Sequence, residues 1–311
     1  MTKPIFPLNL SQKAPSQKTS AQIAPAQSRR SFIKQVGFAL AAAPLVGIVA
    51  CGGGSSESAT TSTDTTTGSG STGGSTGGST GTSGTWATGG TAALTANFPA
   101  DSLFDLGTSC SLALTKALTE GPCYFTVDNR DDISESQVGL PMQLCLRVVD
   151  SNCKPLSGLE VEVWHCDIAG IYSGDTSGSS DSAGFSSSFC TGNNANALKA
   201  KWYRGTQVTD SNGRVNFKTC FPGWYSSRTI HIHFRVRNNN NDQVVSQFCF
   251  TDALTQDICT THANYSGRGI QDTTLASGRD TVFGSSATDF IFSTQQNSDG
   301  SLLAWKTIRL S

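Results

Sequence analysis

Charged side chains are scarce in this 311-residue chain, where Asp, Glu, Lys and Arg together make up 14% and hydrophobic residues 37%. Typical globular domains have roughly 25% charged and roughly 45–50% apolar residues, so the composition excludes a chain that is folded throughout its length. After the first 34 residues, basic side chains are also outnumbered by acidic ones. The first 34 residues hold six of the 22 Lys and Arg residues and no acid, which leaves 16 basic and 23 acidic side chains from residue 52 onward, a net charge of −7. So acidic a body disfavours nucleic acid and anionic membrane surfaces as partners, because both bind through basic patches.

The apolar run near the N-terminus is too short to span a membrane. It covers residues 36–50 and follows the pair Arg29-Arg30; at about 1.5 Å per residue it falls short of a hydrocarbon core of about 30 Å. The pair resembles a twin-arginine export motif, and the run ends at Cys51 in a sequence that resembles a lipobox. We therefore interpret residues 1–51 as a twin-arginine, lipoprotein-type signal peptide with a lipid anchor at Cys51, which predicts a periplasmic or cell-surface location. A plain signal peptide that happens to end near a Cys is the alternative.

Residues 52–98 consist mainly of Gly, Ser and Thr, and Glu57 and Asp64 are their only charged side chains. Such a segment buries too little apolar surface to offset its conformational entropy, so we expect a flexible linker. The remaining residues, 99–311, are predicted to form one folded domain, which is long enough for a hydrophobic core.

The cysteines lack the Cys-x-x-Cys spacing that is typical of thiolate metal sites. With Cys51 set aside, nine remain: Cys110, Cys123, Cys145, Cys153, Cys166, Cys190, Cys220, Cys249 and Cys259. In an exported protein these predict disulfides, at most four with one thiol left over, whose pairing the sequence leaves open. A thiolate metal site is the alternative.

The hydrophobic pattern after residue 99 repeats mostly every two residues, which indicates short strands separated by turns. We expect strands at 144–149, 159–164, 215–217, 230–236 and 244–250. A turn or two of helix is possible at 112–118, and no long amphipathic helix competes with the strands. The sequence therefore predicts an all-β sandwich with little helix.

One expected strand, Thr229–Val236, carries two histidines. Alternation sends the aliphatic and aromatic residues to one face and His231, His233 and Arg235 to the other. Side chains two residues apart on a strand stand about 7 Å apart, so both imidazoles can reach one metal ion. The chain has only four histidines, which favours ligation over the alternative of an exposed polar face.

These histidines lie in a series of motifs that resembles the intradiol ring-cleavage dioxygenases, and most closely their exported, single-chain branch. The matching segments are Thr119–Pro122, Val163–Asp167, Gly170–Gly174, Arg204–Gly213, Phe221–Tyr225, Arg228-Thr229 and His231–His233. The ordered series extends over most of residues 110–300 and is far more specific than a lone His-x-His.

The resemblance implies a non-haem Fe(III) held by Tyr172, Tyr225, His231 and His233. Phenolates are hard anionic donors that favour ferric iron, which agrees with this set. It further implies that a catechol-type diol and O2 react to give a cis,cis-muconate-type diacid, with Tyr225 displaced on substrate binding and able to accept a proton. Arg228 matches the family arginine that stabilises negative charge on the ring, and Gln247 matches a glutamine near the ligands.

Two departures from the family pattern bear on the site. Cys123 replaces an aromatic residue of the family's Gly-Pro-Tyr-Tyr, so the pocket is expected to be reshaped or cross-linked there, and Cys190 is expected to pin the inserted 170–203 segment. A linker also replaces the helical region that pairs subunits in cytoplasmic relatives, which predicts a monomer. A non-catalytic exported β-sandwich that binds aromatics, glycans or another metal is the alternative function.

Overall fold

The computed structural model describes residues 84–105, 110–178 and 185–311. The chain divides into two compact units, and all described residues belong to the second, Gly68–Ser311. The predicted signal peptide with Cys51, and the linker up to residue 83, lie outside the described residues. Among the residues that are described, no helix is both long and apolar enough to cross a membrane.

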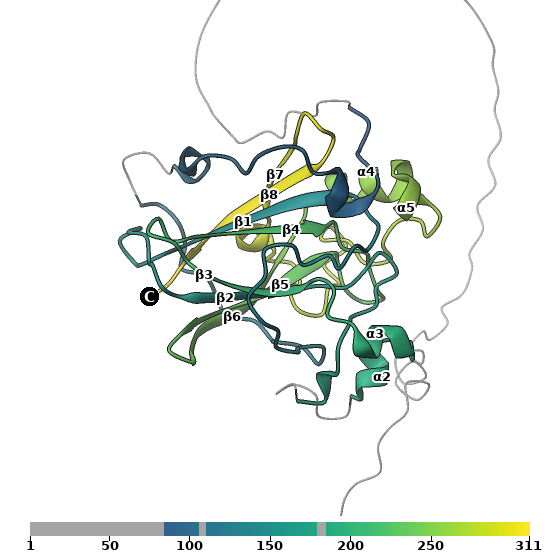
Figure 1. Ribbon diagram of the computed structural model, residues 1–311, viewed down its shortest axis with the longest axis horizontal. Coiled ribbons are helices and arrows are strands. Elements are labelled where there is room, and N and C mark those ends of the chain that lie inside the picture. Colours follow the sequence, from purple (N-terminus) through teal and green to yellow (C-terminus); the bar gives the residue numbers. More distant parts are fainter. Residues whose placement is uncertain (1–83, 106–109, 179–184) are drawn as a thin grey trace, which may run out of the picture. The chain divides into compact units, whose positions relative to one another are not determined.

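Two four-stranded sheets lie face to face and form a sandwich (Figure 1). One sheet has the order β4-β1-β8-β7 and the other β3-β2-β5-β6. The strands are β1 Pro141–Val149, β2 Glu160–Trp164, β3 Arg204–Val208, β4 Arg214–Cys220, β5 His231–Asn238, β6 Asn241–Cys249, β7 Ser293–Gln296 and β8 Leu302–Arg309. All neighbours pair antiparallel except β1 and β8, which are parallel. The predicted all-β sandwich is confirmed.

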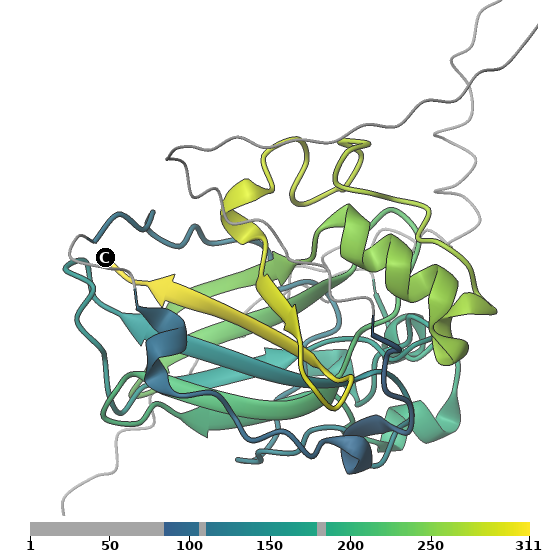
Figure 2. The same cartoon turned by 90° about the horizontal axis from the view of Figure 1, so that it is seen from above.

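The helices are short, and α2 to α5 gather at the end of the sandwich away from the C-terminus (Figures 1 and 2). They are η1 Gly90–Ala93, η2 Asp101–Phe104, η3 Thr176–Gly178, α2 Ser187–Cys190, α3 Ala195–Lys199, α4 Asp252–Thr261, α5 Ala263–Ser266 and η4 Thr288–Phe290. The longest, α4, begins after Thr251, whose side chain accepts a hydrogen bond from the Leu254 amide and so caps the helix.

The core between the sheets follows from the alternation within the strands. In β5, Ile232, Phe234 and Val236 point into it and are at most 1% exposed. Phe234 stacks on Phe248 of β6 with ring centroids 4.4 Å apart. The opposite face of β5 is buried as well, because His231 is 2% and His233 3% exposed. An exposed polar face, the alternative for these histidines, is therefore wrong.

Three expectations about local structure need correction. The segment 112–118 is not helical; it lies along strand edges, where the Thr115 amide donates to Arg309 O and the Leu118 amide to Val245 O, both at 2.9 Å. Helix α4 and strands β3, β7 and β8 were not expected. The folded domain also begins before residue 99, because Trp86 Nε1 donates to the Asp257 carboxylate at 2.8 Å and η1 packs against β1 and β4.

Two disulfides cross-link the domain, Cys110–Cys153 and Cys123–Cys190. Five further cysteines are buried free thiols: Cys145, Cys166, Cys220, Cys249 and Cys259. Disulfides are thus present, but fewer than the four that the count allowed. Burial is the largest cause that raises the pKa of the Cys145 thiol to about 11, so it stays protonated at neutral pH.

Candidate metal centre

Four side chains from three segments meet at the start of β5. His231 Nε2 lies 3.1 Å from His233 Nε2, which lies 3.2 Å from the Tyr172 hydroxyl. The Tyr172 hydroxyl is 3.5 Å from that of Tyr225, and the Tyr225 hydroxyl is 3.1 Å from His231 Nε2. The four donor atoms thus form a closed ring, and we call these residues the Tyr/His quartet. It contains all four residues that the sequence analysis named as metal ligands.

Contacts with nearby residues of the same chain orient the two histidines. His231 Nδ1 lies 2.6 Å from Thr229 O, a carbonyl that can only accept, so Nδ1 carries the proton and the Nε2 lone pair faces the quartet. His233 stacks on Trp164, its partner in the register of β2 and β5, with ring centroids 5.0 Å apart and planes 14° apart. These contacts fix the planes of both rings.

The two tyrosine segments approach each other backbone to backbone, which explains the glycines that accompany them. A Cβ on Gly223 would stand 2.4 Å from Ile168 O, and one on Gly170 would stand 2.2 Å from Trp224 O. The Gly223 amide donates to Asp167 O at 3.0 Å across the same contact. Only glycine permits this approach, which brings Tyr225 beside Tyr172.

Burial sets the protonation states of the quartet. Burial is the main reason that the pKa of Tyr172 is raised well above its usual range. It is also the first cause acting on Tyr225, whose pKa is raised as well. Burial, followed by the charge of Arg228, lowers the pKa of His231 to about 3; burial, followed by His231, lowers the pKa of His233 well below its usual range. In the protein alone the imidazoles are therefore neutral and the phenols protonated.

These donors fit a hard, highly charged cation. The Nε2 atoms of two imidazoles face two phenol oxygens that only a strong positive charge would ionise, and phenolate and imidazole are suitable ligands for ferric iron. Within residues 84–105, 110–178 and 185–311, no group of three or more His, Cys, Asp or Glu side chains could hold a metal ion. The thiolate metal site considered from the cysteine count is therefore not found there.

Arg228 lies beside the quartet and is held from two sides. It is 7% exposed; its Nε donates to the Asp280 carboxylate at 3.1 Å and its Nη2 to Gln247 Oε1 at 2.5 Å. Gln247 Nε2 in turn donates to Thr119 O at 2.8 Å. The structure thus joins Arg228 and Gln247 into one buried network.

Asp280 is the member of this network that sequence reasoning missed. Its carboxylate also accepts hydrogen bonds from the amides of Thr229, Val282 and Phe283 at 2.7 to 2.8 Å. Burial opposes its ionisation, but the Arg228 guanidinium and these amides outweigh burial and hold the pKa of Asp280 below its usual range. The only signal in the sequence that could have pointed to Asp280 is that a buried arginine needs an anionic partner. That signal does not say which acid is the partner, because Asp280 lies 51 residues from Thr229 in sequence.

The other two histidines, His165 and His262, lie outside the quartet. His165 is fully buried and its ring nitrogens lie 2.8 Å from Cys166 O and from Thr219 Oγ1. His262 caps α5 by accepting from the Asn264 amide.

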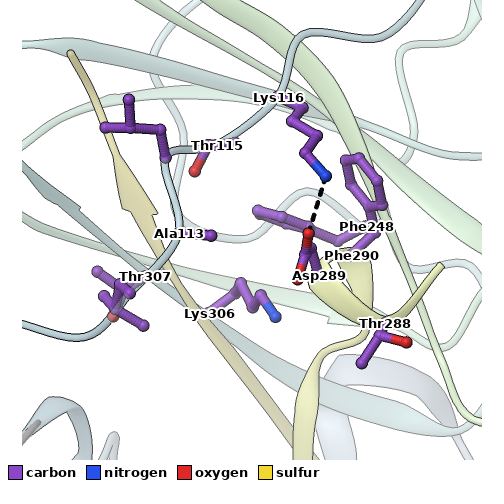
Figure 3. A pocket seen from close by; sticks show the side chains of 11 residues that line it. Ala113, Thr115, Lys116, Phe248, Thr288, Asp289, Phe290, Lys306 and Thr307 are labelled. Atoms are coloured by element: carbon purple, nitrogen blue, oxygen red, sulfur yellow. Dashed lines mark hydrogen bonds and ion pairs between the residues drawn. The ribbon is translucent and has the colours of Figure 1, made fainter. Parts of the chain in front are cut away.

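A separate pocket of about 160 Å³ lies elsewhere on the domain (Figure 3). Its polar lining includes Lys306 and the ion pair of Lys116 with Asp289, whose atoms are 3.0 Å apart. It contains no residue of the quartet and neither Arg228 nor Gln247.

Fold and site define a β-sandwich protein with a buried Tyr/His site at one end of a sheet. A family model described as "Dioxygenase" matches residues 120–265. Among solved structures, an intradiol ring-cleavage dioxygenase from Tetranychus urticae is 27% identical with a TM-score of 0.53, covering 64% of this chain and 95% of that one. A second dioxygenase is 29% identical with a TM-score of 0.53, covering 65% and 95%. No curated protein matches. The chain is therefore similar to the intradiol ring-cleavage dioxygenases, as its motifs predicted.

Proposed function

We propose that this protein is a ferric-iron-dependent enzyme that cleaves a catechol-type diol with O2, between the two hydroxyl-bearing carbons, to a cis,cis-muconate-type diacid. The observation that carries the proposal is the convergence of four donor atoms of the Tyr/His quartet at 3.1 to 3.5 Å. Catechol ring cleavage in general agrees with the family and the fold.

The metal and the chain have separate tasks in this reaction. Ferric iron, which Tyr172, Tyr225, His231 and His233 would hold, would supply the Lewis acidity that activates the diol toward O2. Tyr172, His231 and His233 are buried and serve as fixed ligands, whereas Tyr225 is only partly buried. Tyr225 is therefore suited to leave the metal when substrate arrives and to accept a substrate proton as its phenolate.

Arg228 is assigned to the substrate. Its guanidinium is fixed by Asp280 and Gln247, so its positive charge needs no rearrangement when negative charge develops on the ring. Both oxygen atoms of O2 end in the product, because adding O2 to a diol gives the diacid with no atom left over. The reaction therefore needs no external reductant.

The proposal is tested by measuring three properties of the purified protein: its visible absorption, its iron content and its oxygen uptake with catechol. Tyrosinate bound to ferric iron absorbs visible light, so we expect a red-brown protein with about one iron per chain whose spectrum shifts on adding catechol. Oxygen uptake across a panel of substituted catechols then identifies the substrate. A colourless protein that holds zinc, or that binds catechol without consuming oxygen, would favour the non-catalytic binding module instead.

We further propose that the enzyme is exported, anchored by lipid at Cys51, and active as a monomer. The supporting features are the twin-arginine pair, the lipobox-like sequence and the linker composition. Replacing Cys51 by Ala should release the protein from membranes into a soluble fraction, and light scattering of residues 84–311 should give the mass of one chain. Membrane retention of C51A would contradict the lipid anchor, and a dimer mass would contradict the monomer.

A further inference from the structure

The disulfide Cys123–Cys190 is connected to the backbone of Tyr172. The Tyr172 amide donates to Cys190 O at 2.9 Å, and Cys190 is bonded to Cys123 with Cα atoms 5.5 Å apart. Both half-cystines pack with Tyr172 and Trp164 in one buried cluster that also contacts Tyr225. The cross-link therefore lies against the quartet.

Arg204 connects the same disulfide to the residue after Tyr172. Its Nη2 donates to Cys123 O at 2.7 Å and to Ser173 O at 2.5 Å, and its Nε donates to Ser173 O at 3.0 Å. Arg204 is 1% exposed, and its guanidinium carbon lies 5.8 Å from the centroid of the Tyr172 ring. Tyr172 is thus tied to Cys190 through its own amide, and to Cys123 through Ser173 and Arg204.

We propose that Cys123, Cys190 and Arg204 form a clamp that positions Tyr172 in the quartet, so that retention of the metal depends on this disulfide. This inference rests on the proposed function, since it takes Tyr172 as a ligand. A ligand held in place before the metal binds loses little conformational freedom on binding, which increases affinity. Residues that orient metal ligands typically change metal affinity about 10- to 100-fold when replaced.

The second disulfide provides a matched control. Cys110–Cys153 also joins distant parts of the domain, but neither cysteine belongs to the cluster around Tyr172. The bridged residues are 43 apart in this disulfide and 67 apart in Cys123–Cys190. Because the entropy of loop closure varies only with the logarithm of loop length, both are expected to stabilise the fold by nearly the same amount.

The experiment compares wild type with C123S/C190S, C110S/C153S and R204K. It measures ferric iron retained against a chelator, the wavelength of the visible band, and the melting temperature of the iron-free proteins. We expect both double variants to melt lower by similar amounts, but only C123S/C190S to lose iron affinity, by about tenfold or more, with a shifted band. R204K keeps the charge but loses the planar fork that reaches Ser173 and Cys123 together, so it should shift the band as well.

The outcomes separate this inference from the proposed function. A wild-type protein that binds no ferric iron overturns the proposed function and the inference with it. If wild type binds iron and C123S/C190S binds it equally tightly with the same band, the clamp alone is overturned; the same holds if C110S/C153S loses iron to the same extent. Should C123S/C190S fail to fold, R204K decides, and an unchanged band in R204K overturns the clamp.

Discussion

Nη2 of Arg228 donates a hydrogen bond of 2.5 Å to Oε1 of Gln247, a residue 19 positions later on β6. This bond fixes one edge of the guanidinium, and Asp280 fixes the other through Nε. The arginine is thereby held in one orientation beside the quartet without belonging to it. Its role can be separated experimentally from that of the ligands.

Replacing Arg228 by Ala should slow turnover by about 10²- to 10³-fold, the usual effect of removing one group that stabilises developing charge. Iron content and the visible band should persist, because the quartet is intact. Oxygen uptake and absorption spectra measure the two effects. Arg147→Ala is the control, since Arg147 donates to Asn212 O at an exposed position; its activity should equal wild type. An R228A protein that lost its iron would contradict the assignment.

Replacing the buried ligand Tyr172 should give a different result from R228A, because it changes the quartet itself. Tyr172→Phe removes one oxygen donor while keeping the ring, so most of the visible absorption and at least about 10³-fold of the oxygen uptake should be lost. Tyr203→Phe makes the same change at another buried tyrosine, whose hydroxyl lies 3.4 Å from Val138 O. That control should keep the colour and the activity. A Y172F protein that still consumed oxygen with catechol would show that Tyr172 is not a ligand.

Asp280→Asn should cost stability as well as turnover. The neutral amide leaves Arg228 buried with its charge uncompensated, which typically costs about 3 to 5 kcal/mol. Asp289→Asn is the control, because Asp289 and its partner Lys116 are 48% and 62% exposed, and such surface pairs contribute at most about 1 kcal/mol. Urea unfolding of the iron-free proteins measures the loss of stability in each of the two variants. Equal losses in the two variants would contradict the buried ion pair.

How much could be predicted from the sequence depended on whether a residue lies in a periodic element. In β5, alternation alone placed His231 and His233 on one face, because strand side chains alternate strictly. Tyr172 and Tyr225 lie in loops without any period, so only the resemblance to a family identified them. The wrong helix at 112–118 shows the same limit, because its pairing with Arg309 and Val245 depends on distant strands.

Contacts between distant segments explain what could not be predicted. Asp280 meets Arg228 across 52 residues, and nine cysteines permit many pairings, of which the structure contains two disulfides. The extra chain at 84–98 joins the domain although its composition is that of a linker, because individual groups in it find partners: Trp86 donates to Asp257 of α4, and the amides of Thr95 and Ala96 donate to Asp299. Composition describes a segment on average, whereas docking depends on individual side chains.

His165 predicts a pH dependence of stability. Burial is the largest cause that lowers its pKa from 6.5 to about 4, so the unfolded chain binds a proton at this residue between those pH values and the folded chain does not. The contribution of His165 to stability is therefore greatest above pH 6.5 and falls by about 3 kcal/mol as the pH is lowered toward 4.

His165→Gln should remove this contribution. The variant loses the imidazole that stacks on Tyr203 with centroids 4.6 Å apart, so it should be less stable at pH 7, yet its stability should fall less steeply on acidification. Because the slope of stability against pH is proportional to the difference in bound protons, the variant should take up about one proton fewer on unfolding near pH 5. Urea unfolding at several pH values between 4.5 and 7 gives both slopes. Parallel curves for wild type and variant would mean that His165 is not the buried neutral histidine its contacts indicate.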